Sequence, residues 1–429
     1  MKFLHTADIH LDSPLRGLER YEGAPVQEMR LASRRALENT VSLALEEAVD
    51  FVLIAGDIYD GADRAPRAQL RFLSGLKRLS ERGVKTFIVH GNHDPLDSRS
   101  ALRGDWPKGV TMFGSDAVET VEVTVNGAGA AGGSATVFVH GISYATRDTT
   151  ANLARGFKRT GGTALNIGLL HTNVGGVTGH ASYAPCSLGD LLAADMDYWA
   201  LGHIHQKMFL KEGGPWIAYS GDTQGRSPKP SETGEKGVLL AEVSGATIGP
   251  VTFHPIDAVR FVPCAIDIAE AVDIAALQDL VEARVNDLRS EHDDRSLIVR
   301  ITFEGRGAAA SDLHGDATLA ALRDELRSVY ESVQPFVWIE SLRDHSRGLL
   351  DREALRQSDS LSADLLRLAD GLDADPEAAA AFAGTAAEAL DRPGMVLKAL
   401  RDLEADAPDA IIAEALELAL DGLERETDA

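Results

Sequence analysis

The first 260 residues alternate between continuous apolar runs and stretches with a helical spacing of apolar residues. The runs FVLIAG (51–56) and VKTFIVHG (84–91) are apolar almost throughout, which is typical of strands buried on both faces of a sheet. Residues 26–49 and 66–82 instead place apolar side chains every three or four positions, which predicts helices. Strand–helix–strand alternation predicts βαβ units and therefore an α/β fold.

Beyond residue 117 the apolar pattern becomes that of shorter strands. Residues 118–125 and 136–144 alternate apolar and polar positions, as half-exposed strands do. Residues 165–172 and 198–205 are apolar runs that end in polar residues, and residues 237–253 read as late antiparallel strands. We expect all of these strands to belong to the same N-terminal domain.

Two changes of pattern divide the remaining chain. After a boundary near residues 256–264, residues 262–345 combine three apolar strands with two helices, which predicts a small α+β domain. Residues 350–429 are rich in Ala, Leu, Asp and Glu and read as helical throughout. The predicted organisation is an N-terminal domain over 1–258, an α+β domain over 262–345 and a helical tail over 350–429.

Composition narrows the class of protein. The chain of 429 residues is 44% hydrophobic and 25% charged, as expected of a globular protein. Its beginning, MKFLHTADIH, has no apolar signal core, and no segment reaches the roughly 18 apolar residues of a membrane span. We therefore expect a cytoplasmic protein with no membrane association. Its two cysteines, Cys186 and Cys264, predict reduced core thiols rather than a disulfide framework.

The net charge of −24 is unevenly distributed. Residues 351–429 carry 20 acidic and 7 basic side chains, whereas residues 1–110 carry 16 of each. A strongly acidic chain is a poor non-specific binder of nucleic acid, because that affinity depends on neutralising phosphates. The charge therefore argues against DNA as a substrate of the chain alone, although less so for a neutral catalytic face with an acidic tail elsewhere.

Five short polar motifs follow apolar runs. In chain order they are D-x-H at 8–10, G-D-x-x-D at 56–60, G-N-H-D at 91–94, a single histidine at 171 and G-H-x-H at 202–205. Ligands in open α/β sheets bind at the carboxyl ends of strands, so we expect these motifs to meet at one edge.

Carboxylate, imidazole and amide ligands together suit Mn²⁺, Fe²⁺ or Zn²⁺. Residues i and i+2 of a strand point the same way, so Asp8 and His10 can share one ion. His203 and His205 have the same spacing, but at a strand end they can reach two different ions. Asp57 can bridge the two ions, which would activate a water and neutralise a phosphoryl group.

The order of these motifs resembles that of the calcineurin-like metallophosphoesterases. The segments HTADIHLDSPLRGL (5–18) and YSGDTQGRSPKPSETGEKGVLL (219–240) further resemble the SbcD/YhaO-type components of DNA repair exonucleases. The resemblance covers residues 1–255 well and the two later domains only by size, position and helicity. It implies an α/β two-sheet sandwich flanked by helices, with the α+β domain as a substrate-selecting cap. One departure is Asp12, which stands where many SbcD-like chains have glycine and leaves the substrate range open.

The resemblance also implies a role for each site residue. Asp8, His10, Asp57 and His205 would hold one metal ion, and Asp57, Asn92, His171 and His203 would hold the other. His93 would lie over the scissile phosphate, stabilising the transition state or protonating the leaving oxygen, unless it is purely structural. Asp60 would orient His93, or else it is a loop acid or helix cap. Arg226 and Lys229 are either contacts to a substrate backbone or ordinary loop cations.

The resemblance implies an activity and partners as well. The expected protein is a manganese-dependent DNA exonuclease or endonuclease that hydrolyses phosphodiesters by a metal-bound hydroxide. It would act with an SMC-like coiled-coil ATPase of the SbcC/YhaN type and as a homodimer. The amphipathic stretches at 360–372 and 409–426 would grip that ATPase, or else form a helical mini-domain. A phosphoesterase for small nucleotides and a non-catalytic scaffold are the two rival interpretations.

Overall fold

The computed structural model describes residues 1–13, 25–61, 66–97, 106–125, 134–176, 183–292, 295–313 and 315–388, together with residues 415, 416, 419, 420 and 423. These form two compact units. The first consists of Met1–Cys264, Val285–Ile301 and Glu325–Ser341. The second consists of Ala265–Arg284, Thr302–Asp324 and Leu342–Ala429. Every site residue predicted from the sequence lies in the first unit.

The first unit contains a six-stranded sheet whose strands lie in the spatial order β12–β11–β1–β2–β3–β4. Its strands are β1 (Lys2–Thr6), β2 (Phe51–Ala55), β3 (Lys85–Val89), β4 (Val110–Met112), β11 (Gly237–Ser244) and β12 (Thr247–Pro255). Strands β1 to β4 run parallel to one another, and β11 pairs antiparallel with β1. The carboxyl ends of β1, β2 and β3 therefore lie at one edge.

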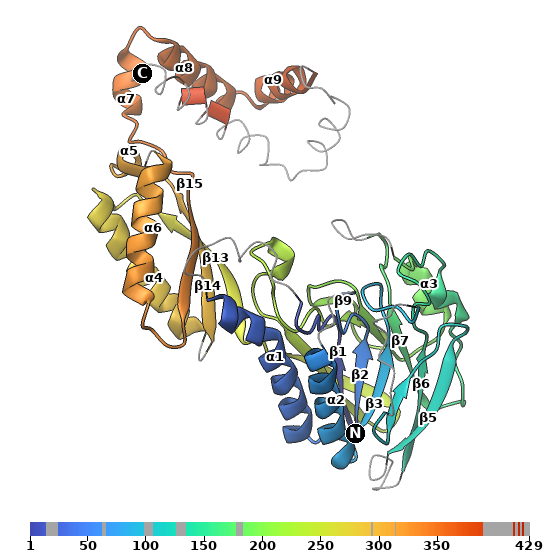
Figure 1. The fold of residues 1–429 in the computed structure, drawn as a ribbon. Coiled ribbons are helices and arrows are strands. Elements are labelled where there is room, and N and C mark those ends of the chain that lie inside the picture. The colour runs from blue at the N-terminus through green and yellow to red at the C-terminus, as the bar shows by residue number, and fades with distance from the viewer. Residues whose placement is uncertain are drawn as a thin grey trace. The chain divides into compact units, whose positions relative to one another are not determined.

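The second sheet has the order β5–β6–β7–β8–β10–β9. Its strands are β5 (Glu119–Val125), β6 (Ala135–Gly141), β7 (Leu165–His171), β8 (Tyr198–Gly202), β9 (Met208–Lys211) and β10 (Trp216–Tyr219). Here β6, β7, β8 and β10 are parallel, and the two edge strands β5 and β9 are antiparallel to their neighbours. Figure 1 shows the two sheets as neighbouring layers.

An apolar core fills the space between the two sheets. It contains Phe3, Phe51, Leu53, Phe87 and Val89 from the first sheet and Val137, Val139, Leu165, Ile167 and Leu169 from the second. All of these side chains are buried, so the sheets pack face to face as in a sandwich.

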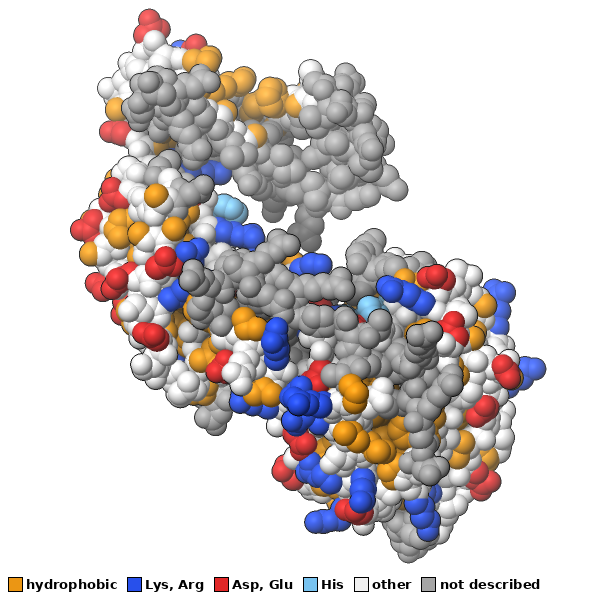
Figure 2. All heavy atoms as spheres, viewed as in Figure 1, with side chains coloured by type: hydrophobic (Ala, Val, Ile, Leu, Met, Phe, Trp, Pro, Cys, Tyr) orange, Lys and Arg blue, Asp and Glu red, His pale blue; other side chains and the backbone are white. Residues whose placement is uncertain are grey.

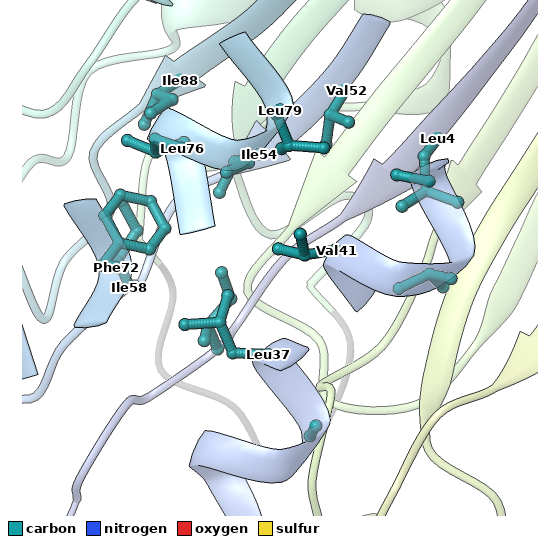
Figure 3. Close-up of a cluster of buried hydrophobic side chains, with 14 of the residues drawn as sticks. Leu4, Leu37, Val41, Val52, Ile54, Ile58, Phe72, Leu76, Leu79 and Ile88 are labelled. Carbon is teal, nitrogen blue, oxygen red and sulfur yellow. The ribbon is translucent and has the colours of Figure 1, made fainter. Parts of the chain in front are cut away.

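The outer face of the first sheet is covered by α1 (Val26–Glu46) and α2 (Pro66–Glu81). Figure 3 shows Leu37 and Val41 of α1 packing with Phe72 and Leu76 of α2 against the sheet. Strand β2 is buried along its whole length because it has the second sheet on one face and these helices on the other. On the second sheet, α3 (Leu188–Ala193) and the short η3 (Leu153–Gly156) cover the corresponding outer face.

The later chain contains a third sheet of three strands and several helices. The strands, in spatial order, are β13 (Val259–Asp267), β14 (Ser296–Glu304) and β15 (Val337–Asp344). The helices are α4 (Ile274–Glu291), α5 (Ala310–Leu313), α6 (Asp316–Tyr330), α7 (Arg352–Gln357), α8 (Leu361–Asp373) and α9 (Pro376–Glu388).

The α/β class expected from the sequence is confirmed. The strands β4, β9 and β10 were not predicted, because three or four residues carry too little periodicity to be recognised. The amphipathic stretch at 360–372 lies in α8, whereas most of 409–426 lies outside the described residues. Among the described helices, none combines the length and apolar character that crossing a membrane requires.

Candidate metal centre

Polar side chains converge where the two sheets present the carboxyl ends of their parallel strands. Each follows or ends a strand of one sheet or the other, namely β1, β2, β3, β7 or β8. They are Asp8, His10, Asp57, Asn92, His171, His203 and His205. All seven predicted metal ligands thus lie in a single region, and all are buried except His205, whose side chain is 14% exposed.

The loop after β1 holds Asp8 and His10 in an unusual backbone conformation. Both have a positive φ, of 50° and 43°, and both lie beyond Thr6, the last residue of the strand. Their N–H groups donate to the carbonyls of Gly56 and Asp57, at 3.1 and 3.0 Å. The strand alternation expected from the sequence is therefore not what aligns them. Left-handed turns, which are costly for residues with a side chain, aim them instead.

Asp57 lies at the centre of the cluster, also at positive φ. Its Oδ1 accepts the backbone N–H of His93 at 2.8 Å, and its Oδ2 lies 3.4 Å from His171 Nε2 and 4.0 Å from His10 Nε2. Burial raises the pKa of Asp57, but the surrounding histidines outweigh it and hold that pKa well below its usual range. The carboxylate is therefore ionised and faces histidines from both proposed ion sites.

Three imidazoles are oriented by a hydrogen bond at Nδ1. His171 Nδ1 lies 2.8 Å from the Ala55 carbonyl, His10 Nδ1 lies 2.8 Å from Asp60 Oδ1, and His205 Nδ1 lies 2.7 Å from Glu232 Oε1. An acceptor at Nδ1 fixes the proton there and makes Nε2 the atom that could bind a metal ion. The Nε2 atoms of His10 and His205 accordingly lie only 3.3 Å apart.

Asn92 and His203 complete the cluster on the His171 side. Asn92 Oδ1 lies 3.0 Å from His171 Nε2, and the rings of His203 and His171 have centroids 5.3 Å apart. The backbone N–H of His203 donates to Asp8 Oδ2 at 3.0 Å, which joins the loops that follow β8 and β1.

The donors present suit divalent metal ions. Ligand atoms of Asp8, His10 and His205 lie within 4.8 Å of one another, and so do those of Asp8, Asp57 and His171. Carboxylate oxygen and imidazole nitrogen are the donors that Mn²⁺, Fe²⁺ and Zn²⁺ accept. Close packing reserves this space, because a Cβ on Gly91 would lie 2.8 Å from His171 Nε2.

His93 lies beside this cluster and is more exposed than its members. Its side chain is 35% exposed, its ring centroid is 5.0 Å from that of His10, and its Nδ1 lies 2.8 Å from Asp60 Oδ1. Burial lowers the pKa of His93, but the hydrogen bond with Asp60 and the nearby carboxylates outweigh it and raise that pKa. The same Asp60 oxygen thus contacts both His93 and His10.

A second layer of charged residues comes from the loop between β10 and β11. Glu232 contacts His205, Arg226 links Asp60 to Glu232, and buried Lys236 lies 2.9 Å from Asp222 Oδ1. Of these loop residues only Arg226 was predicted from the sequence; Glu232, Asp222 and Lys236 were not. Glu232 and Lys236 lie in a polar segment with no apolar run directly before them, whereas Asp222 follows the short strand β10, which was not predicted. Lys229 is exposed at the N-cap of η4 (Pro230–Glu232), three residues before Glu232.

Asp12, the departure from the SbcD-like pattern, is tied to α1. Arg34 forms a two-pronged ion pair with its carboxylate, and the Asp12 backbone N–H donates to Ser33 Oγ at 3.2 Å. Asp12 also has a positive φ, of 60°, where glycine would be free of strain. Its side chain therefore anchors the loop that carries Asp8 and His10.

The pKa values of His171 and His205 predict how metal binding depends on pH. Burial lowers the pKa of His171 and of His205, but nearby carboxylates outweigh it and raise each pKa to about 9. At pH 7 both rings are therefore largely in the doubly protonated form, and each must lose the proton on Nε2 while keeping the one on Nδ1 to become a ligand. Affinity for Mn²⁺ should rise from pH 6.5 to 8.5, by up to about tenfold per unit for each proton displaced.

Calorimetric titration in buffers of different ionisation enthalpy measures those protons directly. We expect between one and two protons to be released per chain at pH 7. An affinity that stays constant between pH 6.5 and 8.5 would contradict this account of the two histidines.

The part of the chain that carries the cluster is similar to known proteins. Residues 1–207, which include all seven clustered residues, match the calcineurin-like phosphoesterase family. Residues 261–347 match the middle domain of metallophosphoesterase YhaO. The uncharacterized metallophosphoesterase YhaO of Bacillus subtilis (strain 168) is 32% identical over 346 residues, which cover 81% of this chain and 82% of that protein.

Two further relatives are nuclease or repair proteins. The SbcD component of the nuclease SbcCD of Bacillus subtilis (strain 168) is 28% identical over 248 residues, covering 52% of this chain and 61% of the relative. The DNA double-strand break repair protein Mre11 of Thermoplasma acidophilum is 26% identical over 257 residues, covering 57% and 63%. The chain thus spans less than two thirds of the length of these two relatives.

Proposed function

The chain belongs to the calcineurin-like metallophosphoesterases, and from this premise we propose that it is a manganese-dependent DNA nuclease of the SbcD/YhaO type. The family assignment makes it a metal-dependent hydrolase related to SbcD and Mre11. The observation that carries the proposal is that the seven predicted ligands form one cluster, with Asp57 among them. The nuclease relatives named above support DNA as the substrate.

We assign each of the proposed site residues a role in hydrolysis. Asp8, His10, Asp57 and His205 would hold one ion, and Asp57, Asn92, His171 and His203 the other. Two bound ions would polarise the phosphoryl group and lower the pKa of a water for attack on phosphorus. His93 is held by Asp60 through Nδ1, which leaves Nε2 to donate a proton to the leaving oxygen as the P–O bond breaks. Burial lowers the pKa of His93, but the hydrogen bond with Asp60 and the nearby carboxylates raise it overall, and this favours the protonated ring that such a step needs.

Surface charge bears on the choice of substrate. The net charge of −24 favours a small phosphoester over DNA, because non-specific DNA binding relies on Lys and Arg. Of that charge, −13 lies within residues 351–429. Figure 2 shows Lys and Arg side chains interspersed with Asp and Glu over the lower, N-terminal part of the visible face. Exposed Lys229, near Glu232, would meet the DNA backbone.

A partner would supply the remaining basic surface. We propose an SMC-like coiled-coil ATPase, since the SbcD relative is by name one component of a larger nuclease, SbcCD. On α8, Leu361 and Leu368 are 60% and 48% exposed, and on α9 Phe382 is 43% exposed. Apolar side chains on such helices are suited to docking against another helix. A homodimer of the chain belongs to the same proposal.

A substrate panel tests the function. Purified protein with Mn²⁺ should degrade linear DNA and leave cyclic nucleotides largely intact, and chelation should stop the reaction. Intact DNA together with rapid turnover of nucleotides would instead establish the small-phosphoester activity. Absence of bound metal after incubation with Mn²⁺ would favour a scaffold, an interpretation that the complete ligand set opposes.

A further inference from the structure

We propose that Arg226 is a positioning residue that joins the two carboxylates behind the metal-binding histidines and thereby sets the affinity for the ions. The inference rests on the proposed metal centre and deepens it. It gives Arg226 a role that differs from the contact with a substrate backbone suggested by its loop.

The contacts of Arg226 show what it joins. Its Nη1 donates to Asp60 Oδ2 at 3.1 Å and its Nη2 donates to Glu232 Oε1 at 3.4 Å. Its backbone N–H donates to the other oxygen of Glu232 at 3.0 Å. Asp60 follows β2 and Glu232 precedes β11, so one guanidinium connects loops from distant parts of the chain.

Both carboxylates act directly on proposed ligands. Asp60 Oδ1 lies 2.8 Å from Nδ1 of His10 and of His93, and Glu232 Oε1 lies 2.7 Å from Nδ1 of His205. The orientation of three imidazoles therefore depends on the two carboxylates that Arg226 holds. His10 and His205 belong to the same proposed ion, and their Nε2 atoms are 3.3 Å apart. A shift of Asp60 would turn His10, and a shift of Glu232 would turn His205, so either shift would alter this ion site.

Burial and charge explain why arginine suits this position. The side chains of Arg226, Asp60 and Glu232 are 21%, 22% and 9% exposed. Carboxylates withdrawn from water need a compensating charge. Guanidinium has several donors in a rigid plane and can serve two carboxylates at once, whereas an ammonium group is a point charge on a flexible stem.

The same charges argue against a third ion in this layer. Ligand atoms of His205, Asp222 and Glu232 lie within 4.8 Å of one another, which alone would suggest a further metal site. Lys236 lies 2.9 Å from Asp222, however, and Arg226 lies 3.4 Å from Glu232. These cations already neutralise both carboxylates, so the group supports the centre rather than binding an ion.

The direction in which metal affinity changes when Arg226 is replaced distinguishes a positioning role from a purely electrostatic one. If Arg226 acted only through its charge, removing it would strengthen the binding of a nearby cation. If it positions the two carboxylates, removing it should weaken binding, by about 10- to 100-fold as is usual for residues that orient ligands. The two roles therefore predict opposite changes in the Kd for Mn²⁺.

The experiment compares Arg226→Met, Arg226→Lys and the matched control Arg260→Met in the full chain. Arg260 is more buried than Arg226 and likewise contacts two carboxylates, those of Asp257 and Glu235, neither of which contacts a proposed ligand. Calorimetry gives the Kd for Mn²⁺, thermal melting without metal gives stability, and DNA hydrolysis gives kcat and KM. We expect both Arg226 variants to bind Mn²⁺ about 10- to 100-fold more weakly, whereas Arg260→Met loses stability but keeps its affinity.

The remaining outcomes overturn the inference in identifiable ways. An unchanged or tighter Kd in Arg226→Met would exclude positioning, and so would full affinity in Arg226→Lys, since lysine cannot span both carboxylates. An increase in KM without a change in Kd would make Arg226 a substrate contact. Wild-type protein that binds no divalent ion would overturn the metal centre itself, which is a different result from any of these.

Discussion

Asp57→Asn should reduce bound Mn²⁺ from two ions per chain to fewer than one and bring hydrolysis down to background. The asparagine keeps the size of the side chain but removes the negative charge that faces His171 and His10, at 3.4 and 4.0 Å. Bridging two cations requires an anion that contacts both. No other single ligand is proposed to serve both ions, so this substitution should have the largest effect on metal content.

Metal analysis and thermal melting together test this expectation. Ligands that bind the folded state alone stabilise it, by about 2.7 kcal/mol at 100 times Kd, so wild-type protein should melt at a higher temperature with Mn²⁺. Asp57→Asn should show no such increase. Asp197→Asn is a suitable control, because Asp197 is an ion-paired carboxylate that precedes β8, at the edge opposite the cluster. Two ions retained by Asp57→Asn would refute the bridging role.

The positions of the clustered residues could be predicted because each motif adjoins an apolar run. A buried parallel strand is recognisable from four or five consecutive apolar residues, as in FVLIA of β2. Parallel strands bring their carboxyl ends to the same edge, so the residues that follow them must lie close together. Neither inference requires any knowledge of side-chain conformation.

The orientation of those residues could not be predicted in the same way. Strand alternation was expected to align Asp8 with His10, but both lie in the following loop at positive φ. Such conformations depend on hydrogen bonds to a neighbouring loop, here to the carbonyls of Gly56 and Asp57. These contacts join positions almost fifty residues apart, and no local pattern reports them.

The contacts of the Asp60 and Glu232 carboxylates could not be predicted from the sequence in full. Asp60 was expected to orient His93, and it contacts His10 with the same oxygen. Glu232 lies in SPKPSETGEKG, where one acid among many polar residues has no distinguishing spacing. Only the packing of this loop against His205 shows that it belongs to the centre. The C-terminal helices expected beyond residue 388 lie largely outside the described residues.

His93→Ala should lower kcat for DNA hydrolysis by about 10²–10⁴-fold, the usual contribution of a positioned acid, while the chain still binds two ions. His93 contacts Asp60 rather than the ion-facing atoms of the cluster, so its removal leaves the seven proposed ligands in place. His254→Ala is a control, because His254 is a partly exposed histidine on β12 whose ring forms a hydrogen bond with Thr252 and lies outside the cluster. It should change neither kcat nor metal content.

Two readouts separate proton donation by His93 from a structural role. A proton donor is active in its protonated form, so the wild-type rate should fall as pH increases through the pKa of His93, which is raised above the ordinary value for histidine. This alkaline limb should disappear in His93→Ala. The variant should also be less impaired with a p-nitrophenyl phosphodiester, because that leaving group departs without a proton. An equal loss on both substrates, with the alkaline limb retained, would show that His93 does not donate the proton.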